Sequence, residues 1–129
     1  MTPYSSIFLR KVLVADAVIS GITGLALLVG AGPLEELFAV PAALLRVTGL
    51  ILIPFAAIVL FFSTEISHSR VWAVITVNAA WVAASVLVLF SGWIQPNAFG
   101  IAFVLGQALV VAVLTELQFA GLRRTTAAA

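Results

Sequence analysis

Four long apolar stretches divide the sequence and constrain its fold more than any other feature. A helix needs about 20 apolar residues to cross the roughly 30 Å hydrocarbon layer of a bilayer, because each residue adds ~1.5 Å to its length. The stretches cover about residues 12–30, 42–63, 71–91 and 98–121. The sequence therefore predicts an all-α chain with four membrane-spanning helices.

The composition supports a lipid environment and excludes several other classes. Of the 129 residues, 64% are hydrophobic and 9% are charged, whereas roughly a quarter of an average soluble domain is charged. The chain has no cysteine and a single histidine, His68, so we expect no disulfide, no Cys-based or multi-histidine metal site and no cofactor. The formal net charge of +1 offers no basic stripe for nucleic acid.

The connections between the stretches are short, which makes neighbouring helices antiparallel and leaves no room for a soluble domain. We therefore expect one domain over residues 1–129, an antiparallel four-helix bundle. The segment 33–40 differs from the other connections. Pro33 suits a first helical position and Glu35 and Glu36 suit the positive end of a helix, so a short interfacial helical turn is expected there.

The orientation of the helices follows from the few basic residues, because Lys and Arg are retained in the cytoplasm during insertion. With a cytoplasmic amino terminus, Arg46 is the one basic residue that lies toward the outside. The other five are then cytoplasmic: Arg10, Lys11, Arg70, Arg123 and Arg124. Both termini are accordingly predicted to be cytoplasmic.

Three polar residues within the stretches, Asp16, Asn78 and Glu116, fall at about one depth. Asp16 lies ~9 Å along its helix from Arg10, and the other two lie ~10–12 Å from the nearest arginine on the same side. Ionisable groups in a bilayer cost a few kcal/mol and mark functional sites by default. These residues are therefore the candidate intramembrane polar site. The alternative is structural, with Asp16 hydrogen-bonded to Asn78 or protonated.

Other polar residues are expected to hold helices together. Ser20 and Thr23 follow Asp16 at i+4 and i+7 and form one small polar face with it, and Gln107 can bond across helices. Gln107 and Glu116 lie on opposite sides of one helix, because nine residues correspond to about 180° of rotation. Either Gln107 and Gln118 line the interior while Glu116 reaches the headgroups, or an oligomer covers both sides.

Arg46 lies ~7 Å inside the outer boundary of its span. Glu35 and Glu36 are close in sequence, so a salt bridge that clamps the outer loop is one interpretation. Contact of the guanidinium with lipid phosphate or an anionic solute is the other.

A weak internal repeat points to some of the same positions. Aligning Gly30 with Gly92 places Asp16 opposite Asn78, and Arg46 then falls within one position of Gln107. Two hairpins of equal orientation would be related by an axis along the membrane normal, as in parallel-repeat membrane proteins.

Three segments carry a resemblance to known proteins. They are residues 24–33, with the sequence GLALLVGAGP, residues 41–46, with PAALLR, and the run LIPFA at 52–56. With these the chain resembles small four-helix inner-membrane proteins of bacteria, and in size and topology it is broadly similar to the DoxX-like group. The resemblance implies the fold and a bacterial inner membrane, and it transfers no catalytic residue.

The sequence contains no Gly-rich phosphate loop, nucleophile elbow or zinc-protease motif. We therefore expect a non-enzymatic membrane component that packs with itself or with a larger complex. The alternative is a small-solute or proton pathway that uses Asp16 and Asn78, formed by an oligomer because four helices enclose little space.

Overall fold

The structure, a computed structural model, describes the backbone of residues 3–128 and the side chains of residues 7–124. Within this range all regular structure is helical. The helices are α1 (Pro3–Val29), α2 (Ala31–Phe38), α3 (Ala42–Thr64), α4 (His68–Phe90) and α5 (Ala98–Ala128). All but α2 are long and apolar enough to cross a membrane. The predicted helical class is thus confirmed, together with four helices that could serve as spans.

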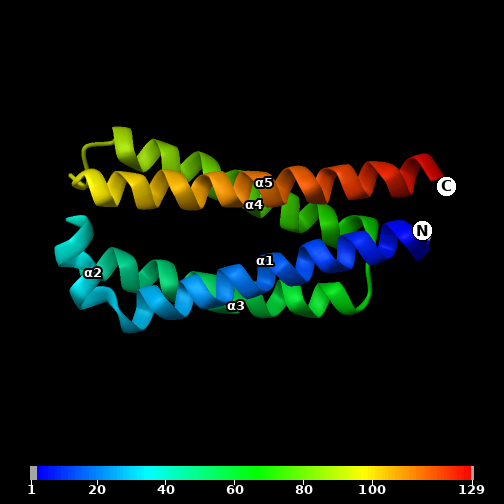
Figure 1. Ribbon diagram of the computed structural model, residues 1–129, viewed down its shortest axis with the longest axis horizontal. Helices are drawn as coiled ribbons and strands as arrows, with labels where there is room; N and C mark the ends of the chain where they lie inside the picture. Colours follow the sequence, from blue (N-terminus) through cyan, green and yellow to red (C-terminus); the bar gives the residue numbers. More distant parts are fainter. Residues whose placement is uncertain (1–2, 129) are drawn as a thin grey trace.

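The four long helices lie lengthwise beside one another, with both termini at one end of the molecule and α2 at the other (Figure 1). We call these the terminal end and the α2 end. Helix α1 packs along α3, and α4 packs along α5, which gives two hairpins. The hairpins join mainly where α1 contacts α5, whereas α3 and α4 scarcely touch.

Two helices extend further than the apolar stretches predicted. Helix α1 already begins at Pro3, and α5 continues to Ala128 past Gly121, which the sequence had suggested as its end. A Cβ atom on Gly121 would lie 2.7 Å from Cδ2 of Leu9 on α1. Glycine at this position therefore permits close helix packing and does not end the helix.

The connection at the α2 end is a full helix of 8 residues where a single turn was expected. It ends at Ala39, whose φ of 55° reverses the chain and whose N–H donates to the carbonyl of Glu35 over 2.9 Å. The Glu35 carboxylate also accepts a hydrogen bond from the backbone N–H of Ala42, the first residue of α3. These bonds fix the angle between α2 and α3.

Buried apolar side chains form two clusters, one near each end of the molecule. The cluster of the terminal end comprises Leu9, Leu13, Ala17, Val59, Val71, Val74, Ile75 and Leu122. The cluster of the α2 end comprises Leu27, Ala31, Phe38, Val40, Leu45 and Ile94. Four buried polar residues, Asp16, Ser20, Asn78 and Gln118, lie at or just inside the inner edge of the first cluster, whereas Ser63 lies at the terminal end itself.

The first hairpin is held by close backbone contact. A Cβ on Gly49 of α3 would lie 2.5 Å from the carbonyl oxygen of Gly24, and one on Gly24 of α1 would lie 2.9 Å from Cβ of Leu52. Small residues at such crossings let helix backbones approach in lipid, where van der Waals packing drives association.

The close contact at this crossing predicts that a glycine-to-alanine substitution destabilises the protein at Gly49 but not at Gly106. Gly49→Ala should lower the free energy of unfolding by about 1–3 kcal/mol, because the added methyl group overlaps the Gly24 carbonyl. Gly106→Ala on α5 is the control, since nothing lies within 4 Å of its Cβ position. Titration of the purified protein from mild detergent into dodecyl sulfate measures both, and equal stability of the two variants would contradict the prediction.

Candidate functional site

Asp16 is the centre of a hydrogen-bond network that joins three helices. Its side chain is completely buried, and its Oδ2 accepts hydrogen bonds from Nδ2 of Asn78 at 2.8 Å and Nε2 of Gln118 at 2.7 Å. Oδ1 accepts a hydrogen bond from the Ser20 hydroxyl at 3.2 Å. The network therefore links α1 to α4 and to α5.

The two amides also bond to each other, as Nδ2 of Asn78 donates to Oε1 of Gln118 at 3.2 Å. No Lys, Arg or His side chain pairs with Asp16 among the residues that the structure describes. Amide and hydroxyl donors alone thus satisfy this carboxyl group in the apolar interior. Such complete internal bonding is what an environment without water requires.

A second polar group joins α4 to α5 nearer the α2 end. Nε1 of Trp81 donates to Oε1 of Gln107 at 2.9 Å, and Nε2 of Gln107 donates to the Ser85 hydroxyl and to the carbonyl of Val104, each at 2.9 Å. Ser85 in turn donates to the carbonyl of Trp81 at 2.8 Å. Gln107 therefore bonds across helices, as its sequence context predicted.

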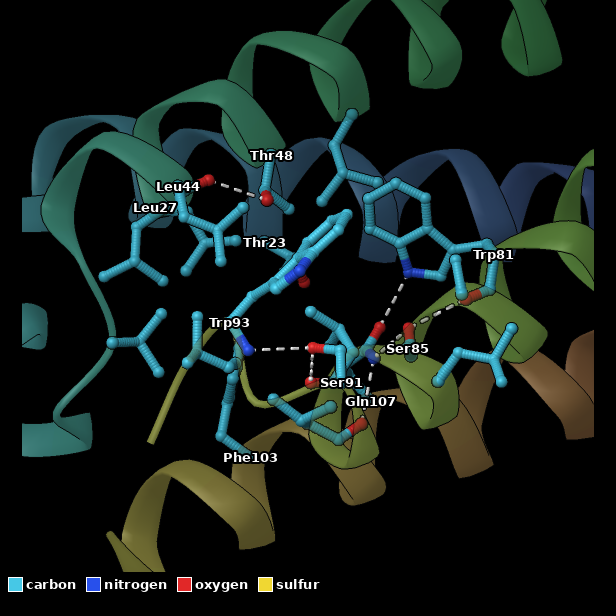
Figure 2. A pocket seen from close by; sticks show the side chains of 18 residues that line it. Thr23, Leu27, Leu44, Thr48, Trp81, Ser85, Ser91, Trp93, Phe103 and Gln107 are labelled. Atoms are coloured by element: carbon cyan, nitrogen blue, oxygen red, sulfur yellow. Dashed lines mark hydrogen bonds between the residues drawn. The ribbon is translucent and has the colours of Figure 1, made fainter. Parts of the chain in front are cut away.

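An apolar cavity of about 480 Å³ lies between the two hairpins, on the side where α3 and α4 separate. Figure 2 shows the second polar group at its edge and the Trp93 side chain reaching across it. Its wall includes Leu27, Leu44, Leu45, Leu52, Leu87, Val88, Ile94 and Phe103. No charged side chain lines this cavity in the described part of the chain.

A smaller cavity of about 150 Å³ continues from the first toward the Asp16 network. The two cavities share Thr23, Leu52, Trp81 and Gln107, which mark their junction. The smaller cavity ends against Ser20 and Asn78, both of which bond to Asp16. Together the cavities reach from the α2 end to the middle of the molecule, while Asp16 itself lines neither.

The structure unites only part of the predicted polar site. Asp16 and Asn78 are hydrogen-bonded, and Ser20 belongs to the same network. Glu116 does not belong to this network, because its side chain is exposed on α5, whereas that of Gln118 faces the interior. Two residues turn a helix by about 200°, so residues at one depth can face opposite ways. Gln107 and Gln118 thus line the interior, as both arrangements considered for α5 allow, and Glu116 lies on the outer side of the single chain.

The expected salt bridge at the α2 end is not formed. Arg46, Glu35 and Glu36 are all exposed, and the described residues include no ion pair between Arg46 and either glutamate. Glu35 instead caps the start of α3 through the N–H of Ala42. Contact of Arg46 with lipid phosphate or with an anionic solute stays a prediction.

Sequence reasoning had given Trp81 no role, and it had placed Gln118 in the interior without assigning it to the group around Asp16. Asn78, Trp81 and Ser85 follow one another at i, i+3 and i+7, the spacing of a single helix face. Gln107 and Gln118 share a face of α5 in the same way. A search for polar residues on one face, in place of one depth, would have found this set.

Comparisons with protein families, with curated proteins and with solved structures find no match to this chain.

The Asp16 network predicts unequal effects at two neighbouring positions on α5. Gln118→Leu removes a donor to a buried carboxyl group and should lower the free energy of unfolding by about 1–3 kcal/mol. Glu116→Leu, two residues earlier and exposed, should change it by less than about 0.5 kcal/mol. Detergent unfolding followed by circular dichroism compares them. A Glu116 variant as unstable as the Gln118 variant would show that the rotation of α5 is wrong.

Proposed function

We propose that this protein is a non-enzymatic accessory component of a membrane that binds a lipophilic molecule between its two hairpins. The observation that carries the proposal is the cavity of about 480 Å³ between them. Sites for small molecules commonly enclose about 300–1,000 Å³ and are lined by apolar and aromatic side chains with a few polar groups. The wall of this cavity has that composition.

The arrangement of the hairpins supports binding from within the bilayer. The cavity lies where α3 and α4 are separated, whereas the opposite contact between α1 and α5 is closed by packing and by the Asp16 network. A lipophilic molecule dissolved in the membrane can thus enter from the side. As an accessory protein, the chain would act beside a second copy of itself or within a larger complex.

Filling the cavity tests this proposal. Ala84 lines it, whereas the adjacent Ala83 does not. We expect the wild-type protein, extracted with its surrounding lipids, to carry a lipophilic molecule that mass spectrometry detects. Ala84→Phe should reduce its occupancy at least about tenfold, which corresponds to 1.4 kcal/mol. Ala83→Phe should retain it, and equal occupancy in both variants would contradict the proposal.

The proposal places the chain in a bacterial inner membrane with both termini in the cytoplasm. The distribution of basic residues supports this orientation, since Arg46 alone lies near the α2 end. Three arginines at the terminal end lie over aromatic rings at 5.0–5.7 Å. Arg70 lies over both Phe61 and Phe62, Arg123 lies over Phe119, and Arg124 lies over Phe8. Such cation and aromatic pairs suit the headgroup region.

The absence of native cysteine makes this orientation directly testable. Gly32→Cys, at an exposed position on α2, should react with an impermeant maleimide added outside the cell. Ser69→Cys, exposed at the start of α4, should react only after the membrane is opened. The reverse labelling pattern would invert the topology.

A solute or proton pathway is a second candidate function. The observation that favours it is the smaller cavity, which ends against two residues that bond to Asp16. The complete bonding of the carboxyl group favours a structural role instead, so this function ranks second.

Substitution of Asp16 distinguishes a role in proton conduction from a purely structural role. If Asp16 conducts protons, Asp16→Asn should reduce proton flux into liposomes at least about tenfold, because the amide retains the shape and loses the titratable group. The measurement uses a pH-sensitive dye inside the liposomes, with empty liposomes as the baseline. Unchanged flux in a folded variant would dismiss the pathway.

A further inference from the structure

The junction of the two cavities contains an unpaired hydroxyl group. Thr23 lines both cavities, and its hydroxyl forms no hydrogen bond with any described residue. The other threonines with described side chains each donate to a carbonyl of their own helix over 2.6–2.8 Å. They are Thr48, Thr64, Thr76 and Thr115. Thr23 is thus distinguished by a hydroxyl that remains available at the junction.

Gln107, at the same junction, presents an acceptor. Both hydrogens of its amide nitrogen are used, one by the Ser85 hydroxyl and one by the carbonyl of Val104. Its Oε1 accepts one hydrogen bond, from Trp81, and an amide oxygen has two lone pairs. One acceptor position on Gln107 therefore remains at the junction, which Thr23, whose hydroxyl can donate or accept, also lines.

The absence of charged side chains from the cavity walls restricts the charge that a bound molecule can carry. No Asp, Glu, Lys, Arg or His lines either cavity in the described chain. A carboxylate, phosphate or ammonium group would enter an apolar cavity without a counter-charge, at a cost of several kcal/mol. The part of a molecule that the cavities enclose should accordingly be neutral.

We propose that the bound molecule is a neutral lipophile with a free hydroxyl group, which lies at the junction between Thr23 and Gln107. The hydroxyl donates to Oε1 of Gln107 and accepts from Oγ1 of Thr23, while the apolar body fills the larger cavity. An ester or ether oxygen accepts from Thr23 but has no hydrogen for Gln107. This inference rests on the proposed function and specifies the chemical class that the same cavity takes.

Tryptophan fluorescence provides a direct measurement of binding. Trp81 lines both cavities and is half-buried. Trp93 also lines the larger cavity but is 86% exposed, and Trp72 is 41% exposed, so the Trp72→Phe/Trp93→Phe variant, in which Trp81 is the single tryptophan, reports from the cavity. The probes are a vicinal dibromide of stearyl alcohol, its methyl ether and the corresponding dibromoalkane, because bromine quenches indole on contact. Each probe is titrated into the variant reconstituted in lipid nanodiscs.

We expect the alcohol to quench at a concentration about tenfold lower than its methyl ether, as one hydrogen bond of about 1.4 kcal/mol would require. Adding Thr23→Val should weaken binding of the alcohol about fivefold or more and leave the alkane unaffected. Thr48→Val is the matched control, because Thr48 lines the same cavity but donates to the carbonyl of Leu44. That control should bind the alcohol as before.

Equal affinities for the alcohol and its ether would overturn the hydroxyl inference while retaining lipophile binding. The same loss of affinity in Thr48→Val as in Thr23→Val would also overturn it. If none of the three probes quenches Trp81, the proposed function itself fails. The two levels of the argument are thus tested separately.

Discussion

Hydrocarbon offers no hydrogen-bond partners, so each polar group that enters it must be bonded within the protein. This constraint organises the centre of the molecule. In the described chain, no buried side-chain nitrogen or oxygen lacks a hydrogen-bond partner. Asp16 is the one residue of this buried set with an ionisable side chain. Its carboxyl oxygens accept hydrogen bonds from a donor on its own helix and from donors on two other helices. The relative positions of α1, α4 and α5 follow from these bonds.

The same constraint explains why one side of the molecule is closed and the other open. Contacts between α1 and α5 include the bond from Gln118 to Asp16 and the close approach at Gly121. No comparable polar bond joins α3 to α4 among the described residues, and these helices separate around the apolar cavity. In lipid an apolar gap of this kind can be filled by an apolar molecule, which relates the packing to the proposed function.

Sequence alone predicted the helical class, the four long apolar helices and the common depth of Asp16 and Asn78, because each depends on hydropathy or on axial position. It also placed Glu116 at the depth of Asp16. Rotation about the helix axis, however, decides which side chain is buried, and on α5 the buried side chain is that of Gln118. The role of Glu35 was missed for a different reason. Its carboxylate had a backbone N–H within reach at Ala42, and such a local cap replaced the more distant Arg46. The cavity was beyond prediction, since the separation of α3 from α4 depends on side-chain packing in three dimensions.

The order of synthesis gives the Asp16 network a consequence for assembly. Both amide partners of Asp16 belong to the second hairpin, 62 and 102 residues further along the chain. A newly inserted first hairpin therefore presents to lipid a carboxyl group bonded to Ser20 alone, a state that costs a few kcal/mol. Arrival of α4 and α5 relieves this cost. The bonding of this carboxyl group is therefore complete only when both hairpins are in place.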